Sequence, residues 1–313
     1  MKTLINIIAT LILSSGCLSI YAQQMPMYTH YMYNTLVVNP AYAGSRDALT
    51  VTGLNRSQWV GFEGAPTTQT LTIHAPLRNE HIGLGLAVVQ DKIGPVRTSS
   101  VTGTFAYIMK LTPKAKLSLG LSAGINMFQA NLNTLLLDQQ SDPVFLNNID
   151  GRITPDFGFG AYYAREKFYA GVSVPNLLQN SYSQVNDVNG NTLISREQRH
   201  YFFIAGTMLK LSDNLALKPT TLIKVTQGAP IQADLTAMFV IMNKFQLGAM
   251  FRSGDAAGGL FGFDITNQFH VGYAYDWSYA LSSSRYNSGS HEIMLRYDFL
   301  LFDKRQIQNP RYF

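Results

Sequence analysis

The chain of 313 residues has few charged side chains and almost no cysteine. Only 14% of its residues are Asp, Glu, Lys or Arg, against roughly 25% in an ordinary soluble domain. The single cysteine, Cys17, excludes an internal disulfide and a paired-thiolate metal site. There is no run of basic residues that would mark a nucleic-acid site. Beyond the first residues no apolar run approaches the 18 that a transmembrane helix needs. These absences argue against a soluble enzyme, a nucleic-acid-binding protein and a helical membrane protein.

Apolar and aromatic residues are plentiful: hydrophobic residues make up 46% of the chain and aromatic residues 12%. A disordered chain, which combines low hydrophobicity with high charge, is therefore excluded. The N-terminus has the features of a secretory signal peptide: Lys2, a short apolar core over 4–13, and Tyr21-Ala22 before Gln23. We expect residues 1–22 to be removed on export. A lipoprotein with a lipidated Cys17 is the alternative, although Ser14 occupies a position where such sites usually have Leu.

The rest of the chain consists of segments in which apolar and small or polar residues alternate. Over 117–125, for example, Leu, Leu, Leu, Ala and Ile alternate with Ser, Gly, Ser and Gly. This period of two places the apolar residues on one face of a strand. Fourteen such segments occur, at 48–60, 67–76, 81–90, 97–110, 114–128, 154–164, 167–174, 199–211, 214–226, 230–242, 244–252, 257–266, 268–278 and 289–301.

The lengths of these segments and of their connections favour an outer-membrane barrel. Most segments have about 9–13 residues, which suits a tilted strand that crosses a bilayer. Short connections alternate with longer ones, as periplasmic turns alternate with outer loops in such barrels. We therefore predict an all-β, transmembrane antiparallel outer-membrane β-barrel of about 14 strands over residues 46–302. An even strand number places both termini in the periplasm, including a tail at 303–313. A soluble β-sandwich remains the alternative.

Two of the outer connections are long, at 129–153 and 175–198. The first carries apolar clusters at 135–137 and 144–146, so we expect it to fold into the lumen or against a partner. The second is polar and reads as a flexible turn around 186–191.

No motif indicates catalysis. The six histidines are not arranged as HExxH, and no GxSxG element appears. We predict that the protein is not an enzyme and that it binds no cofactor or metal. The polar strand faces instead predict paired charges in the lumen: Lys218, Lys224, Asp234, Arg252, Asp264, Glu292, Arg296 and Asp298.

Residues 23–45 precede the first strand and are rich in apolar and aromatic side chains. Exposing so much apolar surface to water is unfavourable, at roughly 25 cal/mol per Å². We therefore expect this segment to dock in the periplasmic mouth of the barrel as a plug or to contact a partner. Tyr28, Tyr31 and Tyr33 can bury their rings while their hydroxyls meet a polar wall. Pro40 favours a turn and Gly44 permits tight backbone before the first strand.

Several sequence strings resemble one family. They are QQMPMYTHYMYNTLVVNPAYAGS (23–45), RSQWVGFEGAPTTQTL (56–71), GVSVPNLL (171–178), VGYAYDWS (271–278), GSHEIMLRYDF (289–299) and the ending NPRYF (309–313). Together they resemble the PorP/SprF family of outer-membrane proteins, which is associated with the type IX secretion system of Bacteroidetes. The resemblance covers nearly the whole mature chain. Met27 and Thr29-His30 depart from it in a region that often reads YSQY.

The resemblance implies a non-enzymatic role in secretion. It implies that the barrel supports export or surface attachment of a large secreted adhesin used in gliding, or links to periplasmic secretion components. The candidate partner or plug contacts are Tyr28, Tyr31, Tyr33, Asn39, Pro40, Ala41, Tyr42, Gly44, Arg56, Trp59 and Gly61. A purely structural role for the 39–45 turn is equally open. The alternative function is a FadL-like transport channel or porin for small hydrophobic molecules, since that fold also resembles a plugged 14-strand barrel with an NPA element, here at 39–41.

Overall fold

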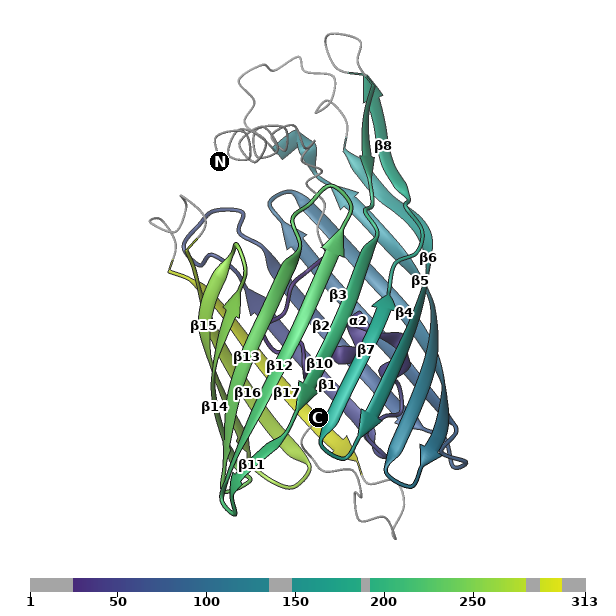
Figure 1. Cartoon of the computed structure of the whole chain (residues 1–313). Helices are drawn as coiled ribbons and strands as arrows, with labels where there is room; N and C mark the ends of the chain where they lie inside the picture. The colour runs from purple at the N-terminus through teal and green to yellow at the C-terminus, as the bar shows by residue number, and fades with distance from the viewer. Residues whose placement is uncertain (1–24, 135–147, 187–191, 280–287, 300–313) are drawn as a thin grey trace, which may run out of the picture.

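The computed structural model describes residues 25–134, 148–186, 192–279 and 288–299 (Figure 1). The predicted signal peptide at 1–22, the tail at 303–313 and the apolar clusters of the first long connection lie outside the described residues. Within the described ranges, no helix is long and apolar enough to cross a membrane.

The strands form one closed antiparallel barrel. Each strand pairs with its neighbours in sequence, and the barrel closes where β1 pairs with β17. On the other side, β10 pairs with both β7 and β12, and β11 continues β10 along β12. Counting β10 and β11 as one strand interrupted at Met208 gives 14 barrel strands, as predicted. Their bounds are β1 (Leu49–Ser57), β2 (Thr67–Pro76), β3 (Ile82–Ile93), β4 (Val96–Thr112), β5 (Ala115–Ala130), β6 (Ile149–Arg165), β7 (Phe168–Val174), β10 (His200–Thr207), β11 (Leu209–Ser212), β12 (Leu215–Thr226), β13 (Gln232–Ile241), β14 (Phe245–Arg252), β15 (Ala256–Asp264), β16 (Phe269–Ser278) and β17 (Ser290–Phe299).

The alternating pattern separates the outside of the barrel from the lumen. Leu121 is 59% exposed and Leu235 54% exposed, whereas Ser118 and Thr236 are buried. Because successive strand side chains point to opposite faces, the apolar face forms the outer wall and the polar face the lumen. A closed barrel also leaves no unpaired strand edge in the bilayer.

The two ends of the barrel differ in their connections. At the end where β1 begins, called here the turn end, the connections are short. At the opposite end, called the loop end, two predicted connections contain more strand than expected. β6 begins at Ile149 rather than at 154, because it continues to pair with β5 up to Ala130. The second connection contains the hairpin β8 (Ser181–Asn186) and β9 (Thr192–Arg196), which projects beyond the barrel in Figure 1. The turn predicted around 186–191 falls between these two strands, and residues 187–191 lie outside the described residues.

The chain before β1 fills the lumen. It contains the short helix α2 (Thr35–Val38) and the 3-10 turn η1 (Pro40–Tyr42), and a second 3-10 turn, η2 (Leu132–Thr134), follows β5. The main cluster of buried apolar side chains joins this N-terminal chain to the lumenal wall. The core of the protein is therefore inside the barrel.

Candidate functional site

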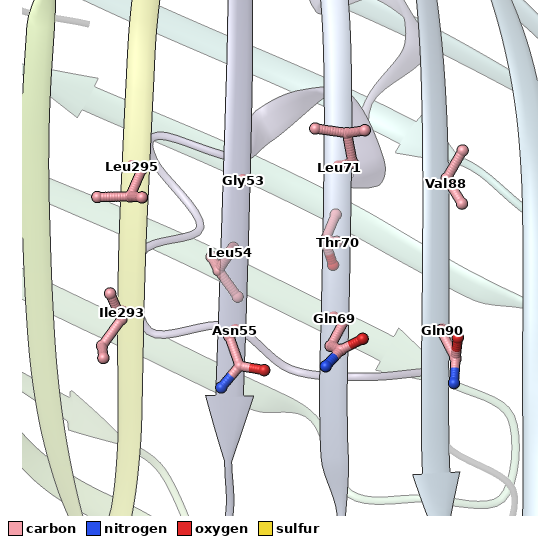
Figure 2. Close-up of a pocket in the computed structure, with 10 residues that line it drawn as sticks. All are labelled: Gly53, Leu54, Asn55, Gln69, Thr70, Leu71, Val88, Gln90, Ile293 and Leu295. Atoms are coloured by element: carbon pink, nitrogen blue, oxygen red, sulfur yellow. The ribbon is translucent and has the colours of Figure 1, made fainter.

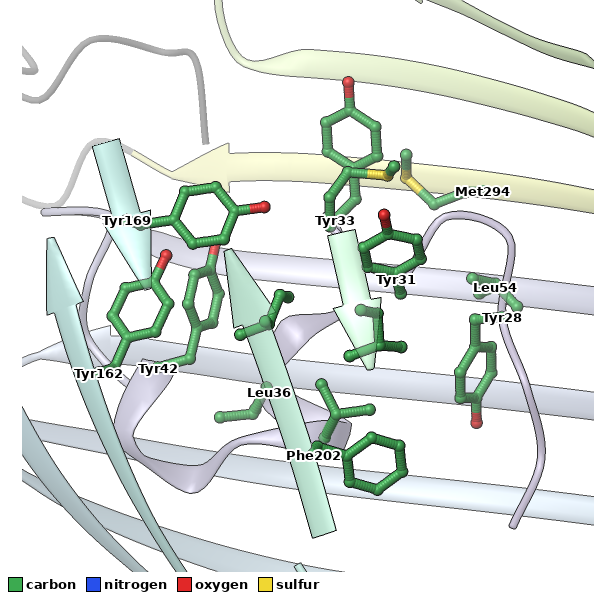
Figure 3. Close-up of a cluster of buried hydrophobic side chains, with 14 of the residues drawn as sticks. Tyr28, Tyr31, Tyr33, Leu36, Tyr42, Leu54, Tyr162, Tyr169, Phe202 and Met294 are labelled. Carbon is green, nitrogen blue, oxygen red and sulfur yellow. The ribbon is translucent and has the colours of Figure 1, made fainter. Parts of the chain in front are cut away.

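Residues 25–48, called here the plug segment, lie inside the lumen. Tyr31 and Ala41 have no exposed surface, and Tyr28, Leu36 and Tyr42 are buried. Figure 3 shows Tyr42 beside Tyr162 of the wall, where the two rings meet edge to face at 5.4 Å, while Tyr28, Tyr31 and Tyr33 lie farther along the lumen. The segment thus supplies much of the core that the polar lumenal faces alone could not form.

Local sequence explains the shape of the segment. Helix α2 ends before Asn39, because the residue before a proline is disfavoured in helical conformation. The Asn39 side chain accepts a hydrogen bond from the amide of Ala41 at 2.9 Å and so caps η1, where Pro40 occupies the first position. Gly44 has a φ of +74°, a value that favours glycine. The sequence NPAYAG is therefore a compact turn.

Near the loop end, a buried cluster of charged groups holds Thr29 and His30. Glu292 accepts hydrogen bonds from the amides of Thr29 at 2.9 Å and His30 at 2.6 Å, and its carboxylate lies 2.8 Å from Nδ1 of His30. Arg56 forms ion pairs with Glu292 at 3.2 Å and with Asp276 at 2.7 Å, and it donates to the Thr29 hydroxyl. Charged groups that are buried are stable only with such partners. The cluster therefore requires this stretch of the plug segment to be in place.

A second buried ion pair lies beside the first. Arg252 contacts Asp234 at 2.9 Å through Nε, and its Nη2 donates to the carbonyl oxygen of Tyr28 at 3.2 Å. The Tyr28 hydroxyl reaches the opposite wall and is 3.0 Å from the hydroxyl of Thr70. One residue of the plug segment therefore connects β14 with β2.

Two further tyrosines attach the segment to the wall formed by β12–β14. The hydroxyl of Tyr31 is 2.9 Å from that of Thr220, and Tyr33 donates to the side-chain oxygen of Gln246. The ammonium group of Lys218 lies 4.7 Å from the centre of the Tyr33 ring, a cation–π distance. The tyrosine rings are thus buried in the lumen while their hydroxyl groups form hydrogen bonds with polar side chains of the wall, as the sequence suggested.

The NPAYAG turn lies against glycines of the opposite wall. A Cβ atom on Gly120 would lie 2.2 Å from the Ala41 nitrogen, and one on Gly83 would lie 2.0 Å from the Ala43 oxygen. A Cβ on Gly160 would lie 2.1 Å from the Asn39 side-chain oxygen. Real Cβ atoms do not approach other atoms so closely. The missing side chains on β3, β5 and β6 therefore create the space for the turn.

At the turn end the segment is held by β17. Arg46 forms an ion pair with Asp298 at 2.9 Å, and the Thr50 hydroxyl donates to the same carboxylate at 2.7 Å. The amide of Gly44 donates to Nδ1 of His74 at 3.2 Å. The segment then enters β1.

The position of the plug segment differs from our expectation that it docks in one mouth of the barrel. Its contacts run from the loop end, at Thr29, to the turn end, at Arg46. The sequence showed that the segment needs burial but not in which direction it runs. Tertiary contacts with β14, β16 and β17 decide the direction.

The other predicted positions are divided between the lumen and the loop end. Trp59 and Gly61 lie in the connection between β1 and β2, where Gly61 is exposed and the indole nitrogen of Trp59 donates to the Ser278 hydroxyl at 3.3 Å. They are not brought together with the NPAYAG turn. The predicted lumenal charges all lie on the inner face, with Asp264 the most exposed at 29%. Among the described residues, no cluster of His, Cys, Asp and Glu could hold a metal ion.

Above the plug segment, toward the loop end, the lumen contains a cavity of about 510 Å³, called here the chamber. Met25, Leu36 and Val37 contribute to it from the plug segment, and its wall belongs to β3–β6. The wall is polar along β4 and β5, whereas its rim carries a small apolar cluster around Phe128 and Ala130. Glu197 reaches it from the chain between β9 and β10, and His200 from the first position of β10. No motif in the sequence indicated this chamber, because its lining comes from seven separate stretches of chain.

Glu197 lies at the chamber and is held by two amide groups. Asn126 donates to its carboxylate at 3.1 Å and Asn180 at 2.8 Å. Burial raises the pKa of Glu197 above its ordinary value, while the Asn180 amide acts in the opposite direction.

A second hollow lies on the outer wall over β17, β1, β2 and β3 (Figure 2). It arises at Gly53, where a Cβ atom would meet nothing within 4 Å. Leu71, Val88 and Leu295 surround it, and Asn55 and Gln69 lie toward the loop end. The hollow faces away from the plug segment.

Solved structures of several outer-membrane proteins are similar to this chain. A monoaromatic hydrocarbon channel, CymD, is 11% identical with a TM-score of 0.50, covering 88% of this chain and 92% of its own. A FadL homologue of Pseudomonas aeruginosa is 11% identical with a TM-score of 0.48, covering 89% and 96%. Omp33 of Acinetobacter baumannii is 14% identical with a TM-score of 0.43, covering 81% and 99%. At these identities the likeness concerns the fold alone.

No curated protein matches the sequence. The family model for the type IX secretion system membrane protein PorP/SprF matches residues 20–297, which is most of the chain. The strings that resembled this family lie largely within the matched range, and the barrel is of the outer-membrane type. The chain belongs to the PorP/SprF family of type IX secretion system membrane proteins.

Proposed function

We propose that this protein is a non-enzymatic, plugged barrel of the outer membrane that supports export or surface attachment of a large secreted protein. Its partners are an adhesin-like secreted protein and components of the type IX machinery. Membership of the PorP/SprF family supports the association with secretion. The signal peptide is removed, and the barrel lies in the outer membrane with its turn end and its C-terminus toward the periplasm. The loop end then faces outward.

The plug segment is the observation that carries the proposal. Its contacts extend from Thr29 to Arg46 and include three buried ion-pair sites, at Glu292, Asp234 and Asp298. An open pore would expose these groups to water, and a conducting function would not require them. A filled lumen suits a barrel that acts through its surfaces and its partners.

The experiment removes residues 25–38 while keeping the signal peptide and Asn39 onward. We expect a barrel that still inserts, as judged by heat-modifiable migration on gels, but no longer exports or retains its partner at the cell surface. The control is Gly53→Ala, on the outer wall where a Cβ atom meets nothing within 4 Å, and it should retain export. Normal surface levels of secreted protein in the deletion strain would show that the segment only packs the lumen.

A FadL-like transport channel is the second candidate, and the chamber above the plug segment favours it. CymD, whose fold is similar, is described as a monoaromatic hydrocarbon channel. A transport channel should retain a small hydrophobic molecule on purification and should release it when the plug segment is deleted. Extraction of the purified barrel followed by mass spectrometry distinguishes this candidate from a secretion role.

A further inference from the structure

The outer wall of the barrel carries a row of amide side chains. Asn55, Gln69 and Gln90 point outward from β1, β2 and β3 and lie opposite one another in the register (Figure 2). The same register continues to Ile293 of β17 on one side and, through β4, to Met127 of β5 on the other. Both of these side chains are apolar and exposed. Because amide groups that face hydrocarbon without a partner cost free energy, this part of the wall suits a molecule that brings polar groups to it.

Two cations lie on the loop-end side of the amide row. Lys92 and Arg97 occupy opposite positions on β3 and β4, and both are exposed. Like charges at opposite positions in a sheet repel each other. Among the described residues no carboxylate forms an ion pair with either cation. Asp91, the neighbour of Lys92, lines the chamber instead and accepts a hydrogen bond from Thr68 at 2.5 Å. A phosphate group between the two cations would remove their repulsion and accept hydrogen bonds from both.

The order of these groups along the wall is that of an amphiphile. Outward side chains on one strand recur about every 6.6 Å. On β3 they are Val88, Gln90 and Lys92, so an apolar, an amide and a cationic group follow one another within about 13 Å. Leu71 of β2, which is exposed, extends the apolar part toward the turn end. A lipid whose acyl chains, sugar and phosphate follow in the same order would match all three levels.

We propose that the outer face of β1–β4, called here the polar strip, binds a phosphorylated glycolipid of the outer leaflet. The phosphate lies between Lys92 and Arg97, the hydroxyl and amide groups of the sugar hydrogen-bond to Gln69 and Gln90, and the acyl chains cover Leu71. A lipid is favoured over a protein because the polar strip lies on the wall that faces the bilayer and becomes apolar toward the turn end. This inference rests on the proposed orientation, in which the loop end faces outward.

The first test is native mass spectrometry of the purified full-length barrel with two added lipids. One is monophosphoryl lipid A, and the other is the same lipid after enzymatic removal of its phosphate. We expect the phosphorylated lipid to bind between about tenfold and a hundredfold more tightly, as one charge-assisted hydrogen bond would give. Equal affinities would overturn the assignment of the phosphate site.

The double variant Lys92→Gln, Arg97→Gln should bind the phosphorylated lipid as weakly as the dephosphorylated one. The matched control is Arg165→Gln, Lys167→Gln, which removes the same two residue types from exposed positions at the turn end. It should leave both affinities unchanged, and heat-modifiable migration on gels checks that both variants are folded. Equal losses in the two double variants would show only a general attraction to positive charge and would overturn the site.

A phospholipid is the other source of a phosphate group. Phosphatidylglycerol carries a negative charge and acyl chains but has no amide-bearing sugar. We expect it to bind about tenfold more weakly than monophosphoryl lipid A, as the loss of one or two neutral hydrogen bonds would give. Gln69→Leu, Gln90→Leu should reduce the affinity for lipid A to that for phosphatidylglycerol. Equal binding of the two lipids by the wild type would overturn the assignment to a glycolipid.

The last test places a photoreactive amino acid in the native cell. At position 90 it faces the polar strip, whereas at position 89, its neighbour on β3, it faces the chamber. We expect a cross-link to glycolipid from 90 and not from 89. Cross-linking of 90 to a protein alone, or of both positions to glycolipid, would overturn the proposal. If lipid A fails to bind while deletion of residues 25–38 abolishes export, only this inference fails and the secretion function stands.

Discussion

Glu292 is the residue whose loss should most weaken the attachment of the plug segment. Its side chain has no exposed surface. The carboxylate accepts hydrogen bonds from two backbone amides and contacts both His30 and Arg56. Glu292→Gln preserves the size of the side chain but removes the charge. Arg56 keeps Asp276 as a partner, so the effect is smaller than that of an entirely unpaired charge. We expect a loss of about 1–3 kcal/mol in the free energy of unfolding, below the roughly 3–5 kcal/mol found when a buried charge is left without any partner.

The assay is reversible urea unfolding in lipid vesicles, followed by heat-modifiable migration on gels. The matched control is Glu166→Gln, whose partner Lys114 and whose own side chain are both exposed in a connection at the turn end. An exposed pair contributes about 0–1 kcal/mol, so this control should be close to the wild type. If the two variants lost similar amounts of free energy, the buried cluster would not hold the plug segment and the reasoning would fail.

Three further predictions follow from the wall and the lumen. Gly120→Ala should destabilise the barrel by about 1–3 kcal/mol, because a Cβ there meets the turn around Ala41, whereas Gly53→Ala, where the space is open, should cost little; similar unfolding midpoints would contradict this. Leu121→Arg on the outer face should cost about 2–4 kcal/mol in vesicles if it lies near the midplane, and unchanged stability would contradict the face assignment. In planar bilayers the intact protein should conduct little and the 25–38 deletion should conduct more; large steady currents from the intact protein would refute a filled lumen.

Much of the barrel was predictable because strands have a simple period. Alternation at Leu117, Leu119 and Leu121 identifies the outer face without any knowledge of neighbouring strands. The start of β6 was less predictable. Asp150 and Arg152 interrupt the apolar pattern there, although the backbone still pairs with β5. Hydrogen bonding between strands does not require an apolar face, so the pattern ends before the strand does.

The lumen was predictable only in part. A segment as apolar and aromatic as 23–45 had to be buried, and the structure places residues 25–45 inside the barrel, with nearly all of 28–44 buried. The glycines that receive the NPAYAG turn, such as Gly83 and Gly160, look in the sequence like any small residue on a polar face. Their role depends on which segment lies opposite, and a single sequence does not contain that information. The same holds for His200, whose place in the chamber comes from the closure of the barrel.

The plug segment and the closure of the barrel depend on each other. The barrel closes where β1 pairs with β17, and both ends of the segment bind this pair: Glu292 and Asp298 of β17 hold it at the loop end and the turn end. Arg56 of β1 joins the first contact. Closing the pair without the segment would bury the Glu292 carboxylate with fewer partners, which is costly in a low-dielectric lumen. The strand pair that closes the barrel is therefore also the pair that the plug segment stabilises.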